Sequence, residues 1–399
     1  MPRRRTIAIG ALAAALAVSP FLPNASTPLP SISGSGSTPK PDAQAFSLDA
    51  ATAGAGEVTP AMQAEIDRVI AAGWRSARPA KALPSDLATS AVRCATFEGQ
   101  RYCLHTGWTT SSEAEVQRRT AVAARTADRT AASTTATGDQ DALATLRRYA
   151  AMSPLARAKA ERAELTAAAK SVAKVWLTRH LDQGVALPTG FLARHPEVRV
   201  PTAREARAAT TYPEKTTILD PEQVAEQTRT YYCGPTSMQM IEWGWSGTEN
   251  SQEYWAKRLG TTTSGSSIYE MVRVTNEATG YDNEDRAGTY ITLDIGDYTW
   301  PKWWQLQVRH IAGYRAPVIL HPILLKRFYP YLDEDASGHY QVGRGYNANG
   351  DDVNLISFFE PWNQARFDPS EPSIARVQWR QAYKSYRANL AHPAHNIGV

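Results

Sequence analysis

The chain has three cysteines among its 399 residues, and the last of them stands where a nucleophile could form. Cys233 opens the run CGPTSMQMIEW, in which a Gly-Pro pair leads into residues typical of a helix. A thiol in the first turn of a helix lies near free N–H groups and the positive end of the helix dipole, which favour the thiolate. Cys233 is therefore a candidate nucleophile, with a small buried core residue as the alternative.

A thiol nucleophile needs a base, and His339 is the candidate in the second half of the chain. It begins an alternating stretch that indicates a strand over residues 339–346, and a second strand over residues 353–359 is expected to return antiparallel to it. The return strand ends at Glu360, so this carboxylate would come back beside His339 and could accept its imidazole N–H. A polar histidine at a strand edge is the alternative interpretation of His339.

Other polar side chains carry weaker signals. Gln227 precedes Cys233 on the chain, and its amide, with the backbone N–H of Cys233, could face the oxygen of a tetrahedral intermediate. Asp351 and Asp352 are alternative carboxylates, but they lie in the expected turn between the two strands. Asn363 could orient a histidine in place of a carboxylate.

Four further histidines are expected to have structural roles. His310 follows an expected helix and is interpreted as a surface or packing residue. His321 ends the apolar run PVILH, which is typical of a buried strand, and is interpreted as a core histidine. His392 and His395 lie beyond the last periodic segment, where exposure to solvent is expected.

Several short motifs occur in the order known from one family. Gln227, YCGPTS at 232–237, PVILH at 317–321, GHYQVGRGYN at 338–347 and EP at 360–361 resemble the papain-like cysteine peptidases of family thirty-nine, the double-glycine leader peptidase type and its free-standing relatives. The resemblance implies Cys233 as nucleophile, His339 as general base and Gln227 as oxyanion-hole donor. The third member in that family is Asp before Pro, and this chain has Glu360 at the matching position.

The resemblance also implies a fold and a reaction. The fold would be an α+β, papain-like cysteine peptidase domain, in which the helix carrying the cysteine packs on an antiparallel sheet carrying the histidine. The reaction would be hydrolysis of a peptide bond through a Cys233 thioacyl intermediate, with His339 as general base. A peptide or protein is the expected substrate, and no metal or organic cofactor is required.

Two other functions are consistent with the same residues. One is a different thiol acyl-transfer enzyme on the same fold, such as a cell-wall amidase or a transglutaminase-like protein. The other is a catalytically inactive binding module that keeps the fold without the chemistry, an alternative that Glu360 in place of Asp leaves open.

The remaining two cysteines are expected to bond to each other. In CATFEGQRYC, residues 94–103, a two-residue Glu-Gly turn would place Cys94 opposite Cys103 at a non-hydrogen-bonded pair, where side chains approach most closely. In an exported protein this arrangement favours a disulfide. A zinc site is the weaker alternative, because only His105 lies nearby.

The rest of the sequence divides into segments of different character. Residues 1–26 combine an Arg triplet, a short apolar stretch and small residues, which is the pattern of a secretory signal peptide. Residues 27–58, rich in Ser, Pro and Gly, predict a disordered linker. Residues 59–213 would form an N-terminal region with the disulfide hairpin and a helical arm, residues 214–390 the peptidase-like domain, and residues 391–399 a tail.

The signal and the charge balance limit the location and the binding partners expected for the protein. The signal predicts a secreted, extracellular protein, and a membrane anchor is disfavoured because Pro20 interrupts the apolar run. Removing the three arginines of the signal lowers the formal net charge from +4 to about +1. No large basic field then remains, so neither nucleic-acid binding nor stable membrane insertion is expected.

Overall fold

The structure is a computed structural model that describes residues 48–399, except for residues 131–136, 203, 206, 208–210, 333, 349–353, 368 and 370–373. Three predictions therefore lie outside the described residues. They are the signal peptide over residues 1–26, the linker up to residue 47, and the two carboxylates of the expected turn, Asp351 and Asp352.

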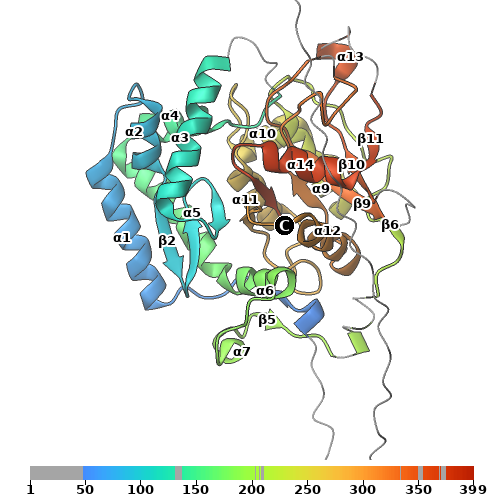
Figure 1. Ribbon diagram of the computed structural model, residues 1–399, viewed down its shortest axis with the longest axis horizontal. Coiled ribbons are helices and arrows are strands. Elements are labelled where there is room, and N and C mark those ends of the chain that lie inside the picture. Colours follow the sequence, from blue (N-terminus) through green and yellow to red (C-terminus); the bar gives the residue numbers. More distant parts are fainter. Residues whose placement is uncertain are drawn as a thin grey trace, which may run out of the picture. The chain divides into compact units, whose positions relative to one another are not determined.

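The first half of the described chain is mainly helical (Figure 1). Its helices are α1 (Pro60–Ser76), α2 (Pro84–Ala91), α3 (Glu113–Thr130), α4 (Ala142–Ala151), α5 (Pro154–Lys170), α6 (Val172–Gln183) and α7 (Phe191–Arg194). Its strands are β1 (Thr52–Ala53), β2 (Cys94–Phe97), β3 (Gln100–Cys103), β4 (Gly107–Thr109) and β5 (Val198–Arg199), and a 3-10 turn, η1, covers Leu48–Ala50.

The expected helical arm is two helices rather than one. Ser153 caps α5, its hydroxyl accepting from the N–H of Ala156, and Gly184 ends α6 in the left-handed conformation. The chain leaves helical geometry between them, at Ser171.

Residues 48–58 correct the linker prediction. Strand β1 pairs antiparallel with β5, and Ala51 and Ala53 are buried in a small cluster with Phe191. Alanines have no strong strand propensity, and a strand this short shows no periodicity, so the sequence pattern did not reveal it.

The predicted disulfide hairpin is confirmed. Strands β2 and β3 pair with Cys94 opposite Cys103, and the two cysteines form a disulfide. Glu98 and Gly99 have φ values of 48° and 81°, the left-handed backbone that a two-residue turn of this type requires at both positions. Because both sulfurs are bonded, the alternative of a zinc site with His105 is wrong.

The second half carries the remaining elements. Its helices are α9 (Cys233–Ser246), α10 (Gln252–Leu259), α11 (Ile268–Ala278), α12 (Trp300–Val308), α13 (Gln364–Phe367) and α14 (Ala382–Ala391), with a π-helical turn, η2, at Arg309–Gly313. Its strands are β6 (Lys215–Thr217), β7 (Thr292–Asp294), β8 (Val318–Leu320), β9 (Gln341–Asn347), β10 (Leu355–Phe359), β11 (Val377–Gln381) and β12 (Asn396–Gly398). The antiparallel pairing of β9 with β10 confirms the predicted hairpin.

One mixed sheet joins the two halves. Among the described residues its order is β11-β10-β9-β8-β12-β7-β4-β3-β2, and β6 pairs with β9. Strand β4 lies beside β7, with Trp108 opposite Leu293, and a shared apolar core extends from α1 to α14. The boundary predicted at residue 213 therefore does not separate two compact bodies.

The predicted tail is part of this sheet. Strand β12 lies between β7 and β8, and Ile397 and Val399 are fully buried beside them. The C-terminus, marked in Figure 1, thus ends inside the fold. Solvent exposure was the wrong expectation for this segment, because a three-residue strand is too short to show a pattern of its own.

Helices and a largely antiparallel sheet confirm the α+β class. Helix α9 packs against α10, α11 and strand β9, which places the cysteine helix against the strand that follows His339. In the described part of the chain, no helix combines the length and the apolar character that crossing a membrane requires.

Candidate active site

Cys233 is the first residue of α9, as its Gly-Pro context predicts. Its side chain is fully buried in an apolar cluster that includes Met238, Met271 and Tyr340. Gly234 allows this packing, because a Cβ there would lie 2.7 Å from the hydroxyl of Ser266. The thiol is the free cysteine of the chain, since the other two are bonded to each other.

The thiol is held in its neutral form by its surroundings. Burial raises the pKa of Cys233 well above its ordinary value, and the negative charge of Asp139 raises it further. Hydrogen bonds from the backbone N–H groups of Tyr340 and Gly234 act in the opposite direction but are outweighed. Position at a helix start alone predicted a favoured thiolate, so burial has overturned that expectation.

His339 and Glu360 form a buried pair. The imidazole Nε2 lies 2.6 Å from Glu360 Oε1, and both side chains are fully buried. A carboxylate accepts hydrogen bonds, so Nε2 carries the proton and Nδ1 keeps its lone pair. The extra methylene of Glu, compared with Asp, does not prevent contact with the imidazole.

Further hydrogen bonds fix the carboxylate of Glu360. Its oxygens accept from Gln341 Nε2 at 2.7 Å, from the Trp362 N–H at 3.1 Å and from the Tyr331 hydroxyl at 3.2 Å. Burial alone would raise the pKa of Glu360, but the charge of His339 and the hydrogen bonds from His339, Trp362 and Gln341 lower it overall. The carboxylate therefore stays ionised and can stabilise a positive charge on the imidazole.

Two of these partners were missed from the sequence. Gln341 begins β9 two positions after His339, and alternation along an extended chain puts such residues on one face. That spacing was a usable signal. Tyr331 lies in an irregular segment before the strand, and nothing local indicated that it reaches Glu360.

Cys233 lies beside the backbone that follows His339, but its thiol does not form a hydrogen bond with the imidazole. The sulfur accepts from the backbone N–H of Tyr340, the residue after His339. The Nδ1 of His339 is buried and has no hydrogen-bond partner among the described residues. The structure thus brings the thiol to the start of the histidine strand without a thiol–imidazole hydrogen bond.

Gln227 is buried but turned into its own loop. Its side-chain Nε2 donates to the carbonyls of Thr230 and Arg229, at 2.7 and 3.0 Å, and its backbone N–H donates to the carbonyl of Pro361. Both amide protons are thus used, and Oε1 is buried without a partner among the described residues. In this conformation Gln227 fixes the loop before Cys233, and it would have to exchange a partner to serve as an oxyanion donor.

A segment of the N-terminal region lies over the residues that flank the site. The Thr137 hydroxyl donates to the carbonyl of Gly338 at 2.6 Å, directly before His339. Gly138 packs so tightly on Tyr231 that a Cβ would lie 2.6 Å from its carbonyl carbon, and its own carbonyl accepts from the Ser266 N–H. These contacts hold the segment against the chain on both sides of the site, and the thiol is fully buried in this closed arrangement.

The alternative polar candidates lie elsewhere. Asn363 caps α13, where its side-chain oxygen accepts from the Arg366 N–H. The described contacts include no hydrogen bond between Asn363 and the imidazole of His339. His310 is buried on η2, and burial lowers its pKa to about 3, consistent with a packing role.

The predictions for the other histidines had different outcomes. His321 is a buried core histidine, as expected, while His395 is half-buried. His392 is buried and lies 2.9 Å from Asp139, so the expectation that it is exposed was wrong.

No curated protein and no solved structure matches the chain. Residues 220–388 match the Peptidase_C39 like family, and this range contains Gln227, Cys233, His339 and Glu360. The similarity to this family therefore covers residues 220–388 of the 399-residue chain.

Proposed function

We propose that the protein is a secreted thiol-dependent peptidase that uses Cys233 as nucleophile and His339 as general base. The observation that carries the proposal is the buried pair of His339 and Glu360, which leaves Nδ1 as the free basic nitrogen at the start of β9. The packing of α9 on β9, within a segment of a peptidase-related family, supports a papain-like arrangement. The signal-like sequence of residues 1–26 supports export.

The proposed reaction has two steps. The Nδ1 of His339 takes the thiol proton, the sulfur of Cys233 attacks the peptide carbonyl carbon, and the imidazolium returns the proton to the leaving amine. Water then attacks the thioester, His339 accepts its proton, and the released thiol recovers that proton as the acid departs. Glu360 remains ionised throughout and stabilises the imidazolium.

Catalysis requires a change from the closed arrangement. The thiol must leave the Tyr340 N–H to reach Nδ1, and a peptide must displace the contacts of Thr137 and Gly138. In the open form, water and substrate dipoles would surround the thiol again. The pKa of Cys233 would then fall, because burial would no longer remove the thiol from solvent.

A second candidate is a binding module without turnover. The raised pKa of Cys233 and the lack of a thiol–imidazole hydrogen bond among the described residues favour it. A thiol acyl-transfer enzyme of another type would share the site but pass the acyl group to an amine rather than to water.

One experiment separates these functions. The mature protein is incubated with a mixed peptide library, with and without an added primary amine, and products are identified by mass spectrometry. A peptidase yields cleaved peptides that Cys233→Ala and His339→Ala abolish, and a transferase yields amine adducts. The variant His180→Ala serves as the control, because this histidine lies on α6 and bonds to the Val185 carbonyl just after that helix. Equal cleavage by all variants would reject the proposal, and binding without products would support the second candidate.

A further inference from the structure

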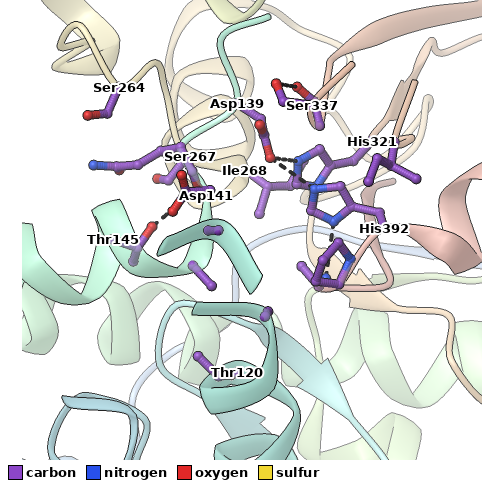
Figure 2. Close-up of a pocket in the computed structure, with 18 of the residues that line it drawn as sticks. Thr120, Asp139, Asp141, Thr145, Ser264, Ser267, Ile268, His321, Ser337 and His392 are labelled. Carbon is purple, nitrogen blue, oxygen red and sulfur yellow. Dashed lines mark hydrogen bonds and ion pairs between the residues drawn. The ribbon is translucent and has the colours of Figure 1, made fainter. Parts of the chain in front are cut away.

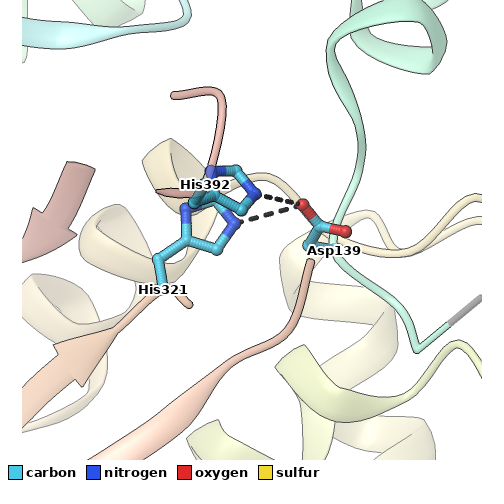
Figure 3. A group of neighbouring side chains, drawn as sticks. All are labelled: Asp139, His321 and His392. Atoms are coloured by element: carbon cyan, nitrogen blue, oxygen red, sulfur yellow. Dashed lines mark hydrogen bonds and ion pairs between the residues drawn. The ribbon is translucent and has the colours of Figure 1, made fainter. Parts of the chain in front are cut away.

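A second cluster of potential ligands lies beside the thiol site. Asp139 precedes α4, His321 follows β8, and His392 follows α14, so three distant parts of the chain meet (Figure 3). One ligand atom from each of the three lies within 4.8 Å of the others, and all three side chains are buried. We propose that Asp139, His321 and His392 bind one divalent transition-metal ion, with Zn²⁺ as the best match.

The spacing of the donor atoms fits an ion between them. Asp139 Oδ2 lies 3.2 Å from His321 Nε2 and 2.9 Å from His392 Nε2. Ligands at about 2 Å from a tetrahedral Zn²⁺ lie about 3.3 Å from one another. Only small side-chain movements are therefore required, and two imidazoles with one carboxylate are donors that suit zinc.

The hydrogen bonding of His321 leaves one of its ring nitrogens available as a ligand. Its Nδ1 lies 2.8 Å from Asn396 Oδ1, and the amide nitrogen of Asn396 donates to the Thr106 carbonyl, which fixes the amide orientation. Nδ1 is therefore the protonated nitrogen, and Nε2 turns its lone pair toward the carboxylate of Asp139. A metal ion placed between Nε2 and Asp139 Oδ2, which lie 3.2 Å apart, would bind the lone pairs of both atoms.

His321 is also held as metal-binding histidines usually are. Such residues donate the second ring N–H to a carbonyl or carboxylate, which sets the tautomer and the ring orientation. Asn396, fully buried on β12, provides this acceptor.

His392 has to change its tautomer to take part. Its Nδ1 accepts from the Ala394 N–H at 3.1 Å, so Nε2 now carries the proton that it donates to Asp139. Coordination through Nε2 moves this proton to Nδ1 and costs the hydrogen bond with Ala394. His392 is therefore the weakest of the three proposed ligands.

The cluster has access to open space. Its three residues line a cavity of about 540 Å³, which Ser264, Ser267 and Ser337 also line (Figure 2). A metal held by three protein ligands keeps a position for water or another small ligand, and the cavity offers room for one.

The ion would connect the covering segment to the sheet. Asp139 follows Gly138, which packs on Tyr231, while His321 and His392 belong to the body that carries the thiol site. Metal binding would therefore hold the segment in its closed position, a consequence that does not depend on peptidase activity.

Metal titration of the full mature chain tests the proposal. Metal-free protein is titrated with Co²⁺, whose visible absorption reports tetrahedral coordination, and Zn²⁺ is then added as a competitor. We expect one ion per chain, displacement by Zn²⁺, and at least tenfold weaker binding in Asp139→Asn and in His392→Gln.

Two controls make the outcome decisive. Asp141→Asn removes another carboxylate from the same cavity and keeps the cap of α4, because Asn caps as well as Asp, so it should bind normally. Cys233→Ser should also bind normally. Near-UV circular dichroism checks that each variant is folded. The proposal would be overturned if no saturable binding occurred up to about 1 mM Co²⁺. It would also be overturned if Asp139→Asn and His392→Gln bound the ion as tightly as the unmodified protein, or if Cys233→Ser lost binding.

Discussion

At the residue scale, the pair of His339 and Glu360 decides whether this chain can do general-base chemistry. Their 2.6 Å contact fixes the tautomer that leaves Nδ1 basic. The longer carboxylate is accommodated because Gln341, Trp362 and Tyr331 hold both of its oxygens. The glutamate in place of aspartate is therefore compatible with the proposed mechanism.

Changing this carboxylate should affect turnover more than binding. We expect Glu360→Gln to lower kcat by about 100-fold or more, since a neutral amide cannot stabilise the imidazolium. Glu360→Asp should cost less, because it keeps the charge and loses only reach. Steady-state kinetics on a cleaved peptide measure both, with the half-buried Glu226→Gln as control. Turnover that survives in Glu360→Gln would remove this residue from the mechanism.

The pKa of the thiol gives a second prediction at this scale. Because burial raises the pKa of Cys233, its alkylation should be slow near neutral pH and accelerate only above the ordinary thiol range. The unfolded state loses this proton first, so the free energy of unfolding should also fall as pH rises above the ordinary thiol pKa. Iodoacetamide labelling across pH tests the first effect, with urea-unfolded protein as reference. Equal rates for folded and unfolded protein would contradict it.

At the element scale, we expect the segment around Gly138 to limit access to the thiol. It lies against Tyr231 on the nucleophile side and against Gly338 on the histidine side. Its backbone at Gly138 has φ near 109°, a conformation that side-chain-bearing residues rarely adopt. A small side chain here should therefore loosen the closure without touching a proposed catalytic group.

Gly138→Ala tests this closure. The added Cβ would meet the Tyr231 backbone at 2.6 Å, so we expect the segment to shift and Cys233 labelling to accelerate about tenfold. Gly184→Ala is the matched control: its φ is also positive, at 69°, but a Cβ there meets nothing within 4 Å. It should lower the melting temperature slightly and leave labelling unchanged. Equal labelling rates for the two variants would show that the segment does not limit access.

At the scale of the whole molecule, the N-terminal region and the family segment are one folding unit. Strand β4 pairs with β7, and the core joins α1, α12 and α14. The disulfide hairpin belongs to this unit, with Cys94 and Cys103 packed on α2 and α3.

Removing the disulfide should therefore destabilise the protein as a whole. For Cys94→Ser with Cys103→Ser, the loop-entropy model gives a loss of about 3 kcal/mol, which lowers the melting temperature by about 5 °C or more. Calorimetry should show one transition before and after the change. A transition that splits in two would contradict a common folding unit.

The sequence by itself determined the features that depend on neighbouring residues. The opposition of Cys94 and Cys103 follows from a two-residue turn, and the meeting of His339 with Glu360 follows from the return of one hairpin. The start of α9 at Cys233 follows from the Gly-Pro context. In each case a local backbone conformation, set by side-chain sterics and hydrogen bonding, determines where these neighbouring residues lie.

Only the tertiary structure decided which distant segments meet. The burial of Cys233, the closure by the segment at Gly138 and the cluster of Asp139 with His321 and His392 each join parts of the chain far apart in sequence. No local pattern encodes such contacts, because they depend on how the sheet orders its strands and on which surfaces the core buries. Burial reversed the expected ionisation of the thiol. The rise in the pKa of Cys233 caused by loss of solvent is larger than the lowering expected at the start of a helix.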